Sequence, residues 1–298
     1  MKFGRYKRWE ISGHLILGTM SFLAIIPFIL LIISSFSNEQ TVVRNGYSFF
    51  PEKFSIAAYQ YIFNQWEVIG SGYLVTIIVT CVGTFIGVSI SALIGWTLSR
   101  KSLPGRNFIL FFVTFTMMFS GGLTAQYLIY TQIFQLKNTI FGLIVPNLMM
   151  NGFFVMTFRN YFEHHIPGTL LEAAKMDGAS EVKSFFKIVL PLSAPIIITI
   201  GLPQALMYWN DWMNGMYYLS PGSKLQSIQT ILNNINENIK FLQDNNLGSA
   251  GGQMSTAELP STTIRMAMAV VGVLPIICVF PFLQKWLVKG ITEGAVKG

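Results

Sequence analysis

Six long stretches of this chain carry no charged side chain. They lie between Glu10 and Glu39, Glu67 and Arg100, Arg106 and Lys137, Lys137 and Arg159, Lys187 and Asp211, and Arg265 and Lys285. Because a helix needs roughly 20 mostly apolar residues to cross a bilayer, each stretch has room for one membrane span. We expect these spans at residues 13–36, 69–98, 107–132, 139–158, 193–212 and 266–286, which makes the chain an all-α membrane protein.

The composition supports a membrane protein and argues against several other classes. Charged residues make up 11% of the 298 residues and hydrophobic residues 52%, whereas soluble domains carry about 25% charged residues. The net charge of +7 does not indicate a nucleic-acid partner, because the basic residues are scattered between apolar stretches. The sequence shows no CxxC, His/Cys cluster, HExxH or GxSxG motif, so we expect neither a metal site nor a catalytic site.

The basic residues also predict the orientation of the spans. Six spans place both termini on one side, and 14 of the 20 Lys and Arg residues fall on that side. The positive-inside rule then places both termini in the cytoplasm. Residues 1–12 become a short cytoplasmic N-terminus and residues 13–298 a single transmembrane domain, with outer loops at 37–68, 133–138 and 213–265.

The middle of the expected spans lacks the groups that drive many membrane proteins. No Asp, Glu, Lys or Arg lies at the middle of any of them, although proton relays and ion-coupled carriers place such groups inside the bundle. We therefore expect an energy source outside this chain.

Small residues recur four apart in the second expected span, at Gly83, Gly87, Ser91 and Gly95. On a helix they form one narrow strip that another backbone can approach closely. The strip is consistent with ordinary helix packing and with a specific subunit interface.

The connection at residues 159–192 carries the clearest local signals. Pro167 and Gly168 predict a turn, after which Thr169 and Glu172 have the spacing of a capping box. Gly178 fits the residue after the end of this short helix, and Ser180 fits the cap of a second helix that re-enters the membrane. The connection is therefore predicted to hold a short helix, a sharp turn and a second helix.

This connection resembles the EAA loop of ABC importer permeases. The family pattern E-A-A-x-x-D-G-A, followed by I-x-L-P, matches Glu172, Ala173, Ala174, Asp177, Gly178 and Ala179, then Ile188, Leu190 and Pro191. The alternative is a capped loop helix that only connects two spans. The resemblance implies a coupling helix that docks into a cleft of a cytoplasmic ATPase, with Glu172 at the contact and Gly178 shaping the turn.

The resemblance extends over nearly the whole chain. Trp209-Asn210-Asp211-Trp212 and the carboxyl-terminal residues 280–285, 288–290 and 294–298 are similar to the sugar-importer branch, in particular to the smaller maltose-type permease of the Gram-positive oligosaccharide and lipoprotein-associated group. The implied fold is the type I ABC importer (MetI-like) permease fold with six transmembrane helices.

The resemblance also implies a set of partners. They are a second homologous permease subunit, two cytoplasmic ATPase subunits that bind ATP and Mg, an extracytoplasmic solute-binding protein, membrane lipid and a carbohydrate. We expect no cofactor on this chain, because Gly290–Gly298 does not fit the P-loop pattern. The competing hypotheses are an importer of the same architecture for a peptide or amino acid, and a membrane enzyme or stand-alone channel.

Aromatic and amide side chains near the ends of spans are candidates for the solute path, because proteins hold neutral sugars with such groups. The candidates are Asn147, Asn151, Tyr208, Trp209, Asn210 and Trp212. An aromatic belt at the membrane interface is the alternative for the aromatic members. Asn147 and Asn151 are expected on one helical face, where interhelical hydrogen bonding is the alternative to a ligand contact.

The last outer loop contains an amphipathic pattern. Apolar residues recur at three- and four-residue steps at Leu225, Ile228, Ile231, Leu232, Ile235, Ile239 and Leu242. This helix is expected either to pack on the permease or to dock the external binding protein. Residues 244–256, rich in Asn, Gly and Ser, are expected to form a flexible connector.

Overall fold

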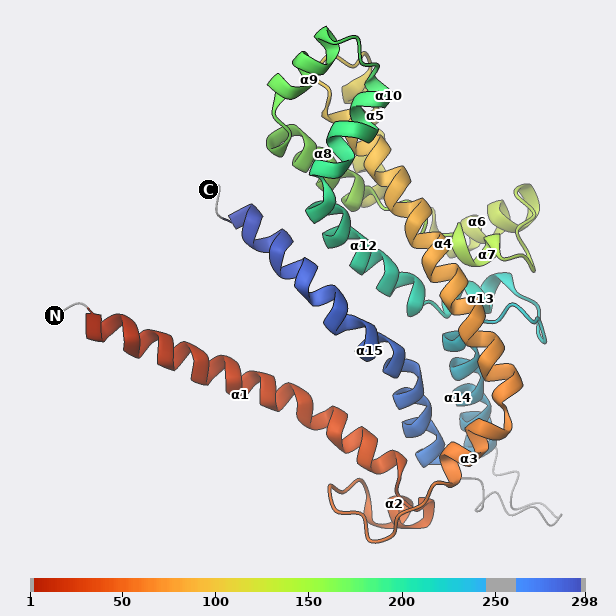
Figure 1. The fold of residues 1–298 in the computed structure, drawn as a ribbon. Helices are drawn as coiled ribbons and strands as arrows, with labels where there is room; N and C mark the ends of the chain where they lie inside the picture. Colours follow the sequence, from red (N-terminus) through yellow and green to blue (C-terminus); the bar gives the residue numbers. More distant parts are fainter. Residues whose placement is uncertain (1–2, 245–260, 296–298) are drawn as a thin grey trace. The chain divides into compact units, whose positions relative to one another are not determined.

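The structure is a computed structural model that describes residues 3–244 and 261–295. The secondary structure of these residues consists of helices and one isolated β-bridge, between Ser37 and Phe54. The α-helices are α1 (Phe3–Ser35), α2 (Glu39–Asn45), α3 (Ala57–Asn64), α4 (Trp66–Ser99), α5 (Arg106–Met118), α6 (Gly122–Leu128), α7 (Phe141–Ile144), α8 (Gly152–His165), α9 (Gly168–Met176), α10 (Glu181–Ser184), α11 (Leu190–Leu192), α12 (Ala194–Trp209), α13 (Met213–Tyr218), α14 (Ile228–Asp244) and α15 (Ser261–Ala295) (Figure 1). Two π-helical turns, η1 (Ile129–Ile133) and η2 (Phe185–Val189), complete the order.

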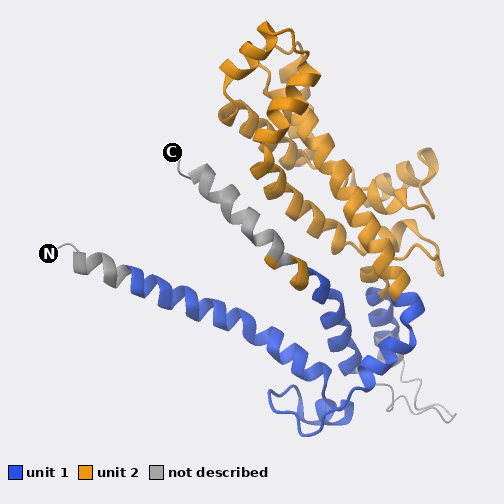
Figure 2. Ribbon diagram, in the orientation of Figure 1, with its two compact units in different colours: residues 1–69, 232–276 blue, residues 70–231, 277–298 orange. Residues whose placement is uncertain are grey.

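The chain divides into two compact units, coloured separately in Figure 2. The first consists of residues 1–69 and 232–276, and the second of residues 70–231 and 277–298. The predicted connector at 244–256 lies outside the described residues except for Asp244, which ends α14.

In the first unit, hydrogen bonds and ring stacking hold the segment between α1 and α3, which contains α2. The Ser55 N–H donates to the Phe36 carbonyl at 2.8 Å, and Tyr59 stacks on Phe36 with 4.5 Å between ring centroids. The Glu39 carboxylate accepts hydrogen bonds from the N–H groups of Thr262 and Thr263, each at 2.8 Å. These N–H groups belong to the first turn of α15, where helix donors have no partner within the helix. Glu39 therefore caps a helix that lies far away in the sequence.

In the second unit, α4 is the central helix, and its small-residue strip faces the other helices of the unit. A Cβ added to Gly95 would lie 2.7 Å from the Phe158 Cβ of α8, and one on Gly87 would lie 2.8 Å from the Gln204 amide nitrogen of α12. Gly83 faces the ring of Tyr208 in the same way. The strip thus packs α4 within its own unit, which favours the helix-packing interpretation over a subunit interface.

Three helices of the described chain are long and apolar enough to cross a membrane without a break. They are Glu10–Ser35, Trp66–Ser99 and Thr262–Val279. Each matches one of the predicted spans at 13–36, 69–98 and 266–286.

Two helix pairs are bent, one inside the predicted span at 107–132 and one at the start of the predicted span at 193–212, which α12 otherwise occupies as a continuous helix. Arg106–Met118 meets Gly122–Ile133 at 117°, and Glu181–Leu192 meets Ala194–Trp209 at 79°. The expectation of one continuous helix over 107–132 is therefore wrong. Gly122, with a φ of +80°, allows the first bend. Near the second bend, Pro195 has no N–H to donate to the carbonyl four residues earlier.

The predicted span at 139–158 is interrupted as well. The short helix α7 ends at Ile144, Asn147 adopts a φ of +61°, and α8 begins only at Gly152. Pro146 cannot donate to a helical bond, so a turn replaces the middle of the helix. Asn147 and Asn151 consequently do not share a helical face, and that expectation is wrong.

The amphipathic helix of the last outer loop forms as α14. At its start, Ile228 and Ile231 are buried in the second unit, and the Ile228 N–H donates to Thr76 Oγ1 at 2.8 Å. This end of the helix packs on α4, in agreement with the expectation that the helix packs on the permease.

Candidate functional site

The short helix α9 begins two residues earlier than a Thr169 cap requires, at Gly168 instead of Leu170. Pro167 occupies the cap position with an extended backbone and makes no side-chain cap bond. Thr169 lies inside the first turn, so the predicted capping box with Glu172 is wrong. The physical reason is Pro167: the residue before a proline is disfavoured in helical conformation, so α8 ends at His165 and α9 starts directly after the proline.

The carboxyl end of α9 is a complete Schellman motif. The Ala179 N–H donates to the Ala174 carbonyl at 2.9 Å, and the Gly178 N–H donates to the Lys175 carbonyl at 3.1 Å. Gly178 has a φ of +75°, a left-handed conformation that favours glycine. The prediction that Gly178 follows the helix end is confirmed.

The second helix of the loop begins as expected. Ser180 is the cap of α10, and its side-chain oxygen accepts a hydrogen bond from the Lys183 N–H at 3.3 Å. A π-helical turn over Phe185–Val189 and the short α11 then lead toward the bend before α12. Only four residues therefore separate α9 from α10.

The outer face of α9 is available to a partner. Glu172, Ala173 and Asp177 are exposed, and Met176 is 88% exposed. Ala174 is buried, and Leu171 packs on the aromatic core beneath the helix. The exposed methionine suits a protein contact, because methionine is enriched at interfaces.

The inner face of α9 packs on an aromatic core through Leu171. Trp96 of α4 lies 5.8 Å from Phe162 of α8 and 6.0 Å from Phe185, measured between ring centroids. Phe158 stacks on Phe162 at 5.7 Å. This core joins the helices before and after α9 to α4, so both ends of α9 are anchored to packed helices.

Tyr208, one of the predicted solute-path residues, has a structural partner. Its side chain is 1% exposed, and its hydroxyl donates to the Ile144 carbonyl at 2.9 Å. Nearby, the Gln204 amide donates to the Leu148 carbonyl at 2.6 Å, and the Asn214 amide donates to the Pro146 carbonyl at 3.0 Å. Together these side chains satisfy carbonyls of the irregular turn between α7 and α8, as irregular backbone at membrane depth requires.

Gln204 and Asn214 were missed as site residues in the sequence. The available signal was an amide side chain within or next to a strongly apolar stretch, which is rare in membrane spans unless it has a partner. Their partners lie 56 and 68 residues away, so local patterns could not identify them.

The remaining path candidates differ in their surroundings. Asn151 caps α8 by accepting a hydrogen bond from the Phe153 N–H at 2.9 Å. The Asn210 amide donates to the Leu206 carbonyl in its own helix at 2.9 Å. Asn147 and Trp212 are exposed, and Trp209 is half-buried. Their contact with a solute stays a prediction.

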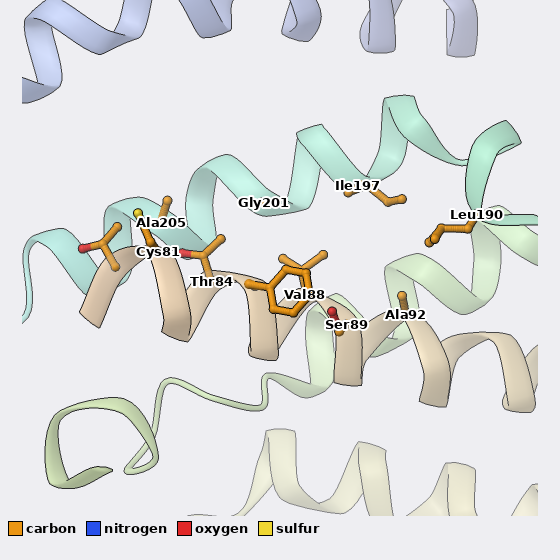
Figure 3. A pocket seen from close by; sticks show the side chains of 11 residues that line it. Cys81, Thr84, Val88, Ser89, Ala92, Leu190, Ile197, Gly201 and Ala205 are labelled. Carbon is orange, nitrogen blue, oxygen red and sulfur yellow. The ribbon is translucent and has the colours of Figure 1, made fainter. Parts of the chain in front are cut away.

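A groove of about 580 Å³ runs along α4 and α12. Figure 3 shows Thr84 and Val88 of α4 opposite Gly201 and Ile197 of α12, with Cys81 and Ala205 at one end. Its lining is almost entirely apolar and consists of residues other than the six path candidates. The groove suits a hydrocarbon surface better than a sugar, which needs hydrogen-bond partners.

Known proteins match this chain over nearly its full length. It is 37% identical over 97% of its length to the polygalacturonan/rhamnogalacturonan transport system permease protein YtcP of Bacillus subtilis, covering 97% of that protein. It is 34% identical to protein LplC of the same organism, covering 97% of this chain and 95% of that one.

A solved structure has the same fold. A chain of a bacterial ABC transporter involved in the import of the acidic polysaccharide alginate superposes with a TM-score of 0.77 at 25% identity, covering 94% of this chain and 96% of that chain. The family described as binding-protein-dependent transport system inner membrane component matches residues 87–293, which include all of α9. This chain therefore belongs to that family, the multi-pass membrane permeases of ABC importers, whose ATP hydrolysis takes place on separate subunits.

Proposed function

We propose that this chain is a permease subunit of an ATP-driven, binding-protein-dependent importer that moves an oligosaccharide across the cytoplasmic membrane. The observation that carries the proposal is α9: an EAA helix with its carboxylate and methionine exposed, ended by a Schellman turn at Gly178. Relatives named for polygalacturonan, rhamnogalacturonan and arabinooligosaccharide transport support a carbohydrate. These names disfavour a peptide or amino acid as the solute.

The proposed assembly has this chain beside a second homologous permease, on two cytoplasmic ATPase subunits. In this arrangement α9 docks in a cleft of one ATPase, and Glu172 and Ala173 lie at the contact together with Asp177. ATP and Mg bind to the ATPase subunits. When the ATPases close, they move α9, and the two permeases change from inward-facing to outward-facing. An extracytoplasmic binding protein then delivers the sugar.

We propose six spans with both termini in the cytoplasm. Each bent helix pair counts as one span, and these two join the three continuous spans. The sixth span consists of α7, the Asn147 turn and α8. This places α9 on the same side as the termini, where an ATP-binding subunit has access.

We propose that Asn147, Trp209, Asn210 and Trp212 contact the sugar. Asn147 has an exposed amide on the turn between α7 and α8, and the other three lie around the end of α12. Tyr208 and Asn151 hold the backbone of the path through the Ile144 carbonyl and the start of α8. A path of this kind offers amide hydrogen bonds and aromatic faces to a sugar.

The test is purification of the chain with its neighbours, followed by ATPase measurements with the binding protein. We expect a complex that contains a second permease and an ATPase dimer, and ATPase stimulation by pectin-derived oligosaccharides added with the binding protein. Stimulation by peptides or amino acids but by no oligosaccharide would overturn the carbohydrate assignment. Purification of the chain without any ATPase would overturn the proposed assembly with ATPase subunits.

A further inference from the structure

Glu163, near the end of α8, is the meeting point of three cationic side chains. Its carboxylate lies 2.7 Å from Arg159, 3.3 Å from Arg106 and 4.0 Å from Lys101. Glu163, Arg106 and Arg159 are each exposed by less than a fifth, whereas Lys101 is 82% exposed. Water screens the two arginine pairs less than it screens an ordinary surface pair, so these two carry the interaction energy.

Arg106 joins three helices through one guanidinium group. It is the first residue of α5, its Nη2 donates to Glu163 of α8, and its Nε donates to the Leu98 carbonyl at 2.8 Å. Leu98 belongs to the last turn of α4, where helix carbonyls have no partner within the helix. The ends of α4, α5 and α8 are therefore held together by hydrogen bonds with fixed directions.

A second ion pair reaches the other side of α9. Arg100, directly after α4, lies 2.9 Å from Glu181, the first residue of α10. Glu181 is 68% exposed, and an exposed pair alone contributes little. Arg100, however, also lies 4.0 Å above the ring of Trp96, and this cation–π contact holds its guanidinium in place.

These contacts enclose the coupling helix. Glu163 lies in the chain just before α9 and is bound by Arg106, the first residue of α5. Glu181 lies just after α9 and is bound by Arg100, which directly follows α4. We name Arg100, Arg106, Glu163 and Glu181 the ionic bracket. We propose that the ionic bracket transmits movement of α9 to α4 and α5, so that its members are positioning residues for coupling.

The proposal rests on the proposed function, because movement of α9 must come from an ATPase. Proximity alone does not establish coupling between two elements. The required observation is a change in α4 that depends on the ATPase and that disappears when the bracket is broken while the complex stays assembled.

A natural reporter for α4 is available. Cys81 lies on α4 and is exposed in the groove of Figure 3. In a C278S background, with the cysteines of the other subunits replaced, a nitroxide label on Cys81 reports the surroundings of α4. The experiment compares its spectrum in the full complex before and after trapping with ATP and vanadate, so no transported solute is needed.

We expect trapping to change the Cys81 spectrum in the parent complex, and Glu163→Gln to return the spectrum of the trapped complex toward that of the untrapped one. Lys101→Gln is the matched control, because the Lys101 pair is the longest and most exposed of the three. It should leave the change intact. ATP binding by the ATPase subunits should be the same in all three complexes.

The second arm of the bracket gives an independent measurement. Arg100→Gln and Glu181→Gln should each reduce the spectral change. The double variant should reduce it no further than either single variant, because both substitutions remove the same ion pair. This cycle decides the matter if the Glu163 variant does not assemble. A full spectral change in assembled Glu163→Gln and Arg100→Gln complexes would overturn the proposal, as would a parent complex whose spectrum does not respond.

Different results are expected if only the ionic bracket is wrong and if the proposed function is wrong. If only the bracket is wrong, the bracket variants respond like the parent while Gly178→Pro, which disrupts the end of α9, abolishes the response. If the proposed function is wrong, the chain purifies without an ATPase and no variant shows a nucleotide-dependent change.

Discussion

The N–H of Ala179 donates to the carbonyl of Ala174 at 2.9 Å, across the left-handed turn at Gly178. This bond closes α9, and four residues then lead the chain from α9 into α10. The exposed face of α9 is thereby held in one orientation relative to the aromatic core beneath it.

Replacing Gly178 by alanine should loosen this turn. A φ of +75° costs a residue with a Cβ about 1 kcal/mol relative to glycine. We expect the amide protons of 178–180 to exchange roughly fivefold faster, which corresponds to that free energy. Hydrogen exchange of the purified complex measures this. Gly168→Ala is the control, because a Cβ there meets nothing within 4 Å and its φ is ordinary; equal exchange in both variants would contradict the role of the turn.

Removing the Tyr208 hydroxyl separates a structural role from a solute contact. Tyr208→Phe leaves the buried Ile144 carbonyl without its donor, at a cost of about 1 kcal/mol. We expect a lower melting temperature of the complex, with the KM for transport unchanged. Tyr47→Phe, at an exposed position, should change neither quantity. A raised KM with unchanged melting would instead place the Tyr208 hydroxyl on the sugar.

The small-residue strip of α4 predicts a packing defect. A Cβ on Gly95 would lie 2.7 Å from the Phe158 Cβ and 3.0 Å from the Val155 carbonyl oxygen. Gly95→Ala should therefore destabilise the protein by about 1–3 kcal/mol, as overpacking of a close helix contact does. Denaturation in detergent is the measurement. Gly18→Ala on α1, where a Cβ meets nothing within 4 Å, is the control, and equal loss in both would argue against the close contact.

Glu39 is expected to hold the start of α15. Its carboxylate accepts bonds from the Thr262 and Thr263 N–H groups and from the Thr263 hydroxyl, each at 2.8 Å. Glu39→Ala should weaken this first turn by about 1 kcal/mol, as loss of a helix cap does. Faster amide exchange at 262–263 would show it. Glu52→Ala, which loses only a surface bond to Asn45, should leave exchange at these positions unchanged.

Local chemistry accounts for what the sequence predicted well. Gly178 and Ser180 act on backbone groups within a few residues, so their spacing alone identified the turn and the second cap. The expected positions of α1, α4 and α15 follow from long apolar stretches for the same reason. A proline at the cap position, in contrast, displaced the expected start of α9 from Thr169.

The rest depends on partners distant in the sequence. Hydropathy indicates that a segment is apolar but not its direction, so the 117° bend before Gly122 and the turn at Asn147 were not predictable from it. Glu163 meets Arg106 across 57 residues, and Tyr208 meets Ile144 across 64. Only the folded chain brings these groups together, which is why local sequence patterns could not pair the residues of the ionic bracket or those that support the irregular turn.

The proposed contact between α9 and an ATPase is tested most directly by photocrosslinking from Met176. A benzoylphenylalanine at this position, where the native side chain is 88% exposed, is illuminated in the purified complex. The same probe at Phe50, equally exposed in the loop after α2, is the control, because the proposed six-span topology places it on the opposite side of the membrane. We expect an adduct with the ATPase subunit from position 176 and none from position 50. An ATPase adduct from position 50, or none from position 176, would contradict the account.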